Sequence, residues 1–397
     1  DVERSRGLGD VYKRQLMKRM NLQAYRFSIS WPRIMPEEGV INPLGVQYYK
    51  NLVEEIKKQG MIPMVTLYHW DLPMWMHEKG GWKSRDVVEA FAEYTRVVVD
   101  ALSDEVTYWM TMNEAATFVG AGYLEGIHAP FERVEPKTEE FVKRTCILTK
   151  HVLLAHGRAV QIIRERAKTK PVIGIAMDGK FFMPNDNTDE AIATAMERTY
   201  ESILDCHRIN WWLDPICKGT YHPQLENIVN DEEKAVIAEQ IDFIGYNCYK
   251  ANNFDDDDGP NPDVKPGIPR TAMGWAITGD ALYWAVRFIH TRYEKPIMIT
   301  ENGMANVDFI MSDGLVHDQQ RIEFLKLYLA GLKRAANEGY PIIGYMYWSI
   351  LDNFEWAEGY DKRFGLVYVN YENQERMEKD SAIWFANYIK QQQDEQS

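Results

Sequence analysis

The chain has 397 residues, of which 45% are hydrophobic and 26% charged, a composition typical of a folded globular protein and not of a disordered one. Its formal net charge of −14 argues against nucleic acid or an anionic membrane as a partner, because binding phosphate requires a basic surface. The sequence has no apolar run near the ~18 residues of a membrane-spanning helix and no apolar leader, so we expect a cytoplasmic protein.

Residues 1–15 are charged, interrupted by glycine and without apolar periodicity. Part of this segment matches the translation of a sequencing-transposon end, so we expect 1–15 to be artefactual and to lie outside the fold. From residue 16 onward, short β-branched or aromatic runs alternate with longer amphipathic segments, which is typical of repeated βα units. The runs lie at 24–31, 62–70, 106–113, 172–178, 243–249, 297–301 and 342–351, and helices are expected at 48–59, 86–102, 142–166, 280–293 and 319–337.

The apolar runs are nearly continuous, as in parallel strands that are buried on both faces. This pattern predicts an α/β fold, a (β/α)₈ TIM barrel in which residues 16–397 form a single, incomplete catalytic domain. No run before residue 24 reads as a strand, so we expect seven of the eight βα units and a missing first strand. An open barrel would expose the edges of the runs 24–31 and 342–351, which is an aggregation hazard.

The four cysteines at positions 146, 206, 217 and 248 have neither the spacing of metal ligands nor the density of a disulfide framework. We expect them to be reduced residues that pack in the core. The sequence predicts no metal site and no cofactor.

Two glutamates stand where predicted strands end. Glu114 follows the run 106–113, and Glu301 closes the run 297–301. In a barrel, both would lie at the carboxyl-terminal face, where an ionised carboxyl after an apolar strand needs a partner or a function. Either residue alone would fit a structural salt bridge. Two on one barrel mouth favour catalysis, because glycosidic bond cleavage needs one protonated and one ionised carboxyl group.

A sugar substrate would also explain aromatic and polar side chains at the ends of other runs, because pyranose faces stack on indole rings. Trp348 and Trp356, with Glu355 between them, follow the last run, and Trp31, His69 and Trp70 end two others. Any one Trp could instead be a core residue.

Five segments closely resemble the signature segments of glycoside hydrolase family one, in family order. They read YRFSISWPRI (25–34), LYHWDLP (67–73), TMNE (111–114), ITENG (299–303) and WSILDNFEW (348–356). The resemblance implies a retaining β-glycosidase with Glu114 as acid/base and Glu301 as nucleophile, ~5 to 5.5 Å apart. It also places Arg26 and Tyr249 beside Glu301, where a guanidinium and a phenol would favour the ionised carboxylate.

The same resemblance implies the contacts with the sugar. Asn113 would bind the 2-hydroxyl, His69 and Trp356 the 3-hydroxyl, and Glu355 the 4- and 6-hydroxyls, with Trp348 as the floor. The resemblance adds Trp70 and Asn247 to the substrate-binding residues, and gives Trp275 either a leaving-group or a structural role. A carboxylate at Glu355 would repel a 6-phosphate, so we expect unphosphorylated β-glycosides or oligosaccharides, with glucosides first and galactosides or fucosides second.

The chain departs from the family pattern at three places. Ala115 replaces a proline, the stretch 274–279 lacks an acidic residue and a proline, and the missing first strand would carry a glutamine that binds the sugar. The alternative is therefore an inactive or sugar-binding fragment of such an enzyme, and a different barrel hydrolase or a metal enzyme is a weaker one. The sequence makes no prediction of the oligomeric state.

Overall fold

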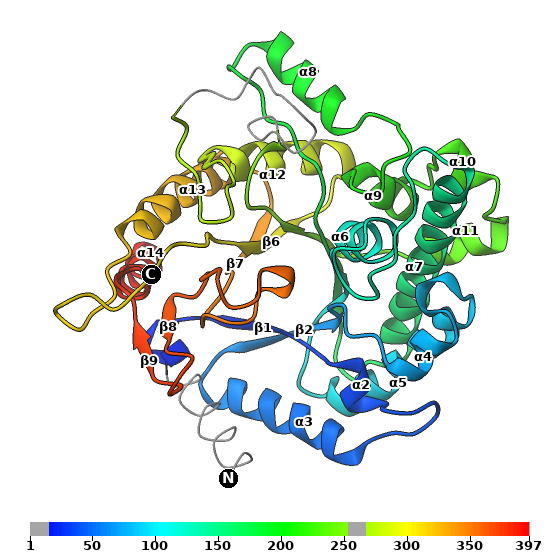
Figure 1. Cartoon of the computed structure of the whole chain (residues 1–397), viewed down its shortest axis with the longest axis horizontal. Helices are drawn as coiled ribbons and strands as arrows, with labels where there is room; N and C mark the ends of the chain where they lie inside the picture. The colour runs from blue at the N-terminus through cyan, green and yellow to red at the C-terminus, as the bar shows by residue number, and fades with distance from the viewer. Residues whose placement is uncertain (1–15, 253–266, 397) are drawn as a thin grey trace.

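The computed structural model describes residues 16–252 and 267–396, so the segment predicted to be artefactual lies outside the described residues. The central sheet has seven parallel strands in the order of the sequence, surrounded by helices (Figure 1). They are β1 (Ala24–Ser28), β2 (Ile62–Tyr68), β3 (Tyr108–Asn113), β4 (Val172–Met177), β5 (Phe243–Asn247), β6 (Ile297–Asn302) and β7 (Ile342–Tyr347). All seven predicted runs are therefore strands, and the barrel prediction is confirmed.

The connecting helices begin where the sequence offers a cap. Asn42 caps α3 by accepting from the Leu44 N–H, and Thr138 caps α7 by accepting from the Phe141 N–H at 3.1 Å. The helices are α2 (Trp31–Ile34), α3 (Pro43–Lys58), α4 (Met74–Glu78), α5 (Asp86–Leu102), α6 (Ala115–Val119), α7 (Glu139–Arg166), α8 (Asp189–Thr199), α9 (Ile209–Lys218), α10 (Pro223–Glu226), α11 (Asp231–Ile237), α12 (Ala281–Tyr293), α13 (Gln319–Asn337) and α14 (Asp380–Gln396), with short turns η1 (Gly81–Lys83), η2 (Gly120–Leu124) and η4 (Trp356–Glu358). A two-stranded antiparallel sheet, β8 (Val367–Val369) with β9 (Arg376–Glu378), follows β7.

Several predicted strands extend past the point where the observed strand ends. The first run was expected to continue to Trp31, but β1 ends at Ser28, and Trp31 begins α2 with Pro32 in its first turn. Similarly, the last run was expected to reach Leu351, whereas β7 ends at Tyr347. In each case the apolar residues continue past the strand, because the segment that follows also packs into the protein.

A layer of side chains fills the barrel below the carboxyl ends of its strands. Five buried residues from consecutive strands form one cluster: Met64, Met110, Ala176, Phe243 and Met298. Gly174 leaves room for the Phe243 ring, since a Cβ at position 174 would lie 2.5 Å from it. The packed layer supports the loops above it, where the site residues lie.

The sheet is open between β1 and β7. Each of these strands pairs on one side only within the described residues, and a groove of about 830 Å³ is lined by both. Residues of β7 are partly exposed, whereas β5 and β6 are entirely buried. Within residues 16–252 and 267–396, no helix is both long enough and apolar enough to cross a membrane.

We expect the exposed edge of β7 to be a site of self-association. Ile343, which is 44% exposed on this strand, is expected to promote pairing between chains, so Ile343→Lys should slow aggregation on heating about twofold or more. Light scattering during a thermal ramp measures this. Leu327→Lys is the matched control, because Leu327 is 51% exposed on α13, away from any strand edge. An equal effect of the two substitutions would contradict a role for the edge.

Candidate active site

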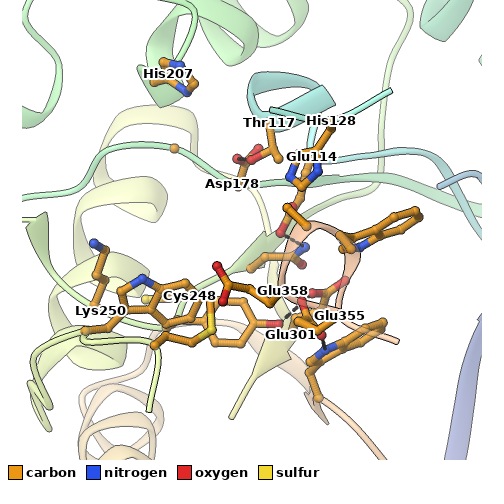
Figure 2. A pocket seen from close by; sticks show the side chains of 18 of the residues that line it. Glu114, Thr117, His128, Asp178, His207, Cys248, Lys250, Glu301, Glu355 and Glu358 are labelled. Atoms are coloured by element: carbon orange, nitrogen blue, oxygen red, sulfur yellow. Dashed lines mark hydrogen bonds between the residues drawn. The ribbon is translucent and has the colours of Figure 1, made fainter. Parts of the chain in front are cut away.

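A cavity of about 430 Å³ opens at the carboxyl ends of the strands (Figure 2). Nine of the eleven predicted site residues line it: His69, Trp70, Glu114, Asn247, Tyr249, Glu301, Trp348, Glu355 and Trp356. The other two, Arg26 and Asn113, lie directly behind its wall, where their side chains bond to residues that line the cavity. The structure thus brings all eleven together from six different strands and the loops after them.

Glu301 lies on β6 and is 5% exposed. Arg26 Nη1 donates to its Oε1 at 2.7 Å, and the Tyr249 hydroxyl donates to its Oε2 at 2.8 Å. Burial raises the pKa of Tyr249 well above its usual value, so the phenol keeps its proton and remains a donor. Glu301 thus has a guanidinium on one oxygen and a phenol on the other, the two neighbours that the family resemblance implies.

Arg26 distributes its donors over four residues of three other strands. Besides Glu301, its Nη2 donates to Asn113 Oδ1 at 2.5 Å, its Nε to Thr66 Oγ1 at 3.1 Å, and its Nη1 to the carbonyl of Thr300 at 3.2 Å. A buried guanidinium needs such saturation, because each unpaired donor would be costly. The side chain therefore fixes β1 against β2, β3 and β6.

Glu114 occupies the turn between β3 and α6. Its N–H donates to the carbonyl of Ala176 on β4 at 2.8 Å, and its backbone is left-handed with φ of 51°. Asn247 Nδ2 donates to Glu114 Oε1 at 2.8 Å, but no cation contacts the carboxyl group among the described residues. Burial, with the nearby carboxylates of Asp178 and Glu301, raises the pKa of Glu114 well above its usual value. The surroundings of Glu114 therefore favour its protonated form.

Two asparagines connect the glutamates. Asn247 Nδ2 also approaches Asn113 Oδ1 at 3.1 Å, and the Thr300 hydroxyl donates to Asn247 Oδ1 at 2.6 Å, which fixes the orientation of this amide. Since Asn113 Oδ1 accepts from Arg26 as well, one hydrogen-bond network joins Glu114 to Glu301. The network holds one carboxyl group with a cation and one without.

Aromatic rings form the opposite wall of the cavity. The His69 ring lies parallel to Trp348, with centroids 5.9 Å apart, and Trp70 lies 4.4 Å from Trp356. Trp348 Nε1 donates to Glu355 Oε2 at 3.4 Å. Burial, with the charge of Arg26, lowers the pKa of His69 to about 3, so this ring is neutral and can both donate to and accept from a hydroxyl.

Trp31 does not belong to this wall, although its position at the end of a run suggested so. It is 0% exposed and stacks on Tyr94 at 5.1 Å, with the edges of Tyr68 and Phe91 against it. Helix α2 turns the indole into the core, which the alternation of residues along a strand could not show.

Residues beyond those predicted complete the site. Asp178 and Thr117 line the cavity near Glu114, and Thr300 orients Asn247 from below. Asp178 ends a predicted strand, the same signal that singled out Glu114 and Glu301, so the sequence could have indicated it. Trp275 packs 5.4 Å from Tyr249 and lines the cavity, which agrees with both roles considered for it.

Among the described residues, Asp205, Cys206 and His207 form one cluster of potential metal ligands, and His207 lines the cavity. His207 Nε2 lies 2.7 Å from Glu125 Oε1, and Lys180 Nζ lies 3.4 Å from Asp205. Burial raises the pKa of the Cys206 thiol well above its usual value, which disfavours the thiolate that a metal requires. The side chains of Asp205 and His207 are thus held by Lys180 and Glu125.

The chain matches the model of Glycosyl hydrolase family 1 over residues 10–394. It belongs to that family. Beta-glucosidase A of Thermotoga maritima is 39% identical, in an alignment covering 95% of this chain and 84% of that protein. A 1,4-beta-D-glucan glucohydrolase of Thermotoga neapolitana is 38% identical over the same shares of the two chains.

Solved structures agree with this assignment. The Thermotoga maritima beta-glucosidase in complex with castanospermine superposes with a TM-score of 0.84 and 37% identity, covering 96% of this chain and 85% of that one. The chain is therefore a family 1 glycoside hydrolase on a TIM barrel. The resemblance drawn from five short segments is confirmed over nearly the whole length.

Ionisation of the half-buried Glu355 should lower the free energy of unfolding as pH rises. Burial raises its pKa from 4.5 to about 7, so the unfolded state releases this proton at lower pH than the folded state, and the free energy of unfolding falls as pH rises between these values. Glu355→Gln cannot ionise and should be more stable than the wild type by up to about 3 kcal/mol at pH 8, with little gain at pH 4. Urea unfolding at both values measures this. Glu358→Gln, an exposed neighbour, should show no such difference.

Proposed function

We propose that this family 1 hydrolase cleaves terminal, non-reducing β-D-glucosides with retention of configuration. The observation that carries the proposal is the pair of carboxyl groups in one network, of which only Glu301 has a cation beside it. Retaining cleavage needs this asymmetry, with a nucleophile that is charged and an acid that is not. A carboxyl separation of ~5 to 5.5 Å stays a prediction.

In the first step, Glu301 attacks the anomeric carbon while Glu114 gives its proton to the departing glycosidic oxygen. A covalent glycosyl-enzyme results, in which Glu301 no longer carries a charge. Glu114 then ionises more easily, because one of the neighbouring carboxylates that raised its pKa has been neutralised. In the second step, Glu114 takes a proton from water, which attacks the same carbon and releases Glu301.

The remaining residues would hold the sugar. We assign the floor to Trp348, the 2-hydroxyl to Asn113, the 3-hydroxyl to His69 and Trp356, and the 4- and 6-hydroxyls to Glu355. Glu355 is half-buried and accepts a hydrogen bond from Trp348 Nε1. Its carboxylate oxygens would therefore lie at the edge of a sugar ring stacked on Trp348. Trp70 and Asn247 support these groups, since each bonds to Asn113 or Glu114.

Relatives support the choice of substrate. Beta-glucosidase A of Thermotoga maritima and the 1,4-beta-D-glucan glucohydrolase of Thermotoga neapolitana bear names that point to glucosides and β-1,4-linked glucans. A complex of the first with galacto-hydroximolactam supports galactosides as secondary substrates. None of these relatives favours an inactive sugar-binding chain, and turnover of 4-nitrophenyl β-D-glucoside by this chain decides between the two.

Residues 16–397 would act as one catalytic domain in the cytoplasm. All four cysteines are free, which agrees with a reducing compartment.

Azide distinguishes the two glutamates. Glu301→Gly should lower hydrolysis of 2,4-dinitrophenyl β-D-glucoside about 10⁴-fold or more, and azide entering the vacated space should form the α-glucosyl azide by a single displacement. Glu114→Ala should still form the glycosyl-enzyme, which azide would convert into the β-glucosyl azide. Product anomers are read by NMR, and circular dichroism controls for folding. If Glu301→Gly gave the β-glucosyl azide and Glu114→Ala the α-glucosyl azide, the nucleophile and acid/base assignments would have to be exchanged.

The carboxylate of Glu355 should make the enzyme discriminate against substrates with a 6-phosphate on the sugar. At pH 8 its carboxylate should repel a sugar 6-phosphate, so kcat/KM for 4-nitrophenyl β-D-glucoside should exceed that for its 6-phosphate by about 100-fold or more. Glu355→Ser should narrow this ratio by about tenfold, because the charge is gone. Steady-state kinetics with both substrates test this, and a ratio near one in the wild type would contradict it.

A further inference from the structure

Asp178 is a carboxylate of the cavity that the double-displacement scheme does not use. It follows β4 directly, and its Oδ2 accepts a hydrogen bond from the Thr117 hydroxyl at 2.5 Å. Its Oδ1 is shielded from solvent and has no hydrogen-bond partner within the described part of the chain. A shielded carboxylate oxygen left in this state is costly and calls for a physical reason.

The backbone brings Asp178 close to Glu114. The N–H of Glu114 bonds to the carbonyl of Ala176, two residues before Asp178 on the neighbouring strand. Thr117, which donates to Asp178, lies on α6 three residues after Glu114. About one helical turn therefore separates Glu114 from the residue that fixes Asp178. Figure 2 shows Asp178 beside Thr117, on the same side of the cavity as Glu114.

Among the described residues, neither of these two carboxyl groups forms an ion pair with an arginine or a lysine. Arg26 is directed to Glu301, and Lys180 forms its ion pair with Asp205. His207 bonds to Glu125, which raises the pKa of the imidazole, and its charge partly lowers the pKa of Asp178. The contact to Glu114 is the neutral amide of Asn247. Burial outweighs the opposing charges of His207 and Arg26 and raises the pKa of both carboxyl groups, so Asp178 and Glu114 cannot both ionise easily.

We propose that Asp178 is a positioning residue that acts through Glu114: the two carboxyl groups form a pair that holds one proton, which keeps Glu114 protonated until the leaving group departs. The inference rests on the acid role proposed for Glu114. Before cleavage, Asp178 and Glu301 carry two negative charges and Glu114 none. Afterwards Glu114 has given its proton to the leaving oxygen and Glu301 is esterified, so the three groups again carry two. The negative charge moves within the site without increasing.

Asp178→Asn removes the charge and retains an oxygen that can accept from Thr117. With phenyl β-D-glucoside, whose leaving group needs a proton, the alkaline limb of the kcat/KM profile should move down by about 1 pH unit. In the alkaline range kcat/KM should then be about tenfold lower than in the wild type. With 2,4-dinitrophenyl β-D-glucoside, whose leaving group departs without a proton, the change should stay below about twofold.

Glu358→Gln is the matched control. It removes one negative charge from the exposed rim of the same cavity, where Glu358 lies 3.8 Å from Lys362, and it should leave the alkaline limb in place. An equal loss by Asp178→Asn on both substrates, or an alkaline limb that does not move, would overturn the proposal.

A titration without turnover separates this inference from the proposed function. Carboxyl ¹³C chemical shifts of glutamate-labelled protein report the protonation of Glu114, whose signal is the one lost in Glu114→Gln. Asp178→Asn should lower the observed pKa of Glu114 by about 1 unit. An unchanged titration would overturn the pair. A shifted titration in a chain that hydrolyses no glucoside would support the pair and refute the proposed function.

Discussion

The site depends on one buried ion pair. The side chains of Arg26 and Glu301 are 7% and 6% exposed, a position in which two charges lose most of their hydration. The pair is tolerable because the guanidinium also bonds to Thr66, Asn113 and the Thr300 carbonyl. These partners belong to β2, β3 and β6, so the bonds that satisfy the arginine also fix the strands whose ends form the cavity.

The ion pair also makes the two glutamates different. They share one network of amides, yet within the described part of the chain the Arg26 guanidinium contacts Glu301 and not Glu114. Glu114 receives an amide N–H, burial and the field of neighbouring carboxylates, all of which follow from its place between β3 and α6. Identical side chains thus lie in different electrostatic surroundings because of the strands that carry them.

The sequence was sufficient for the parts of the molecule that repeat. Buried parallel strands are apolar throughout, and this pattern located all seven, while α5 (Asp86–Leu102) and α13 (Gln319–Asn337) match the expected segments. Glu114 and Glu301 were recognisable because a carboxyl group directly after an apolar strand is unusual. All eleven site residues gather at one cavity, as the family resemblance implied.

The sequence-based predictions were wrong or incomplete where the apolar character of a residue does not determine where its side chain points. Trp31 continues an apolar run, but α2 begins at Trp31 itself and the helix turns its indole into the core. The part played by Asp178 depends on contacts with β3 and α6, and Thr300 acts from within a buried strand. Such roles come from the meeting of distant segments, and a single sequence without aligned relatives does not display them.

Three residues of the cavity wall have left-handed backbones: Trp70, Glu114 and Trp356, with φ of 79°, 51° and 46°. Glycine adopts this conformation freely, whereas a side chain at each position costs on the order of 1 kcal/mol. Random substitution selected for folding alone would therefore drift toward glycine at these positions and erase an acid and two rings of the pocket. The pocket thus holds an acid and two indole rings in place at a cost in folding stability.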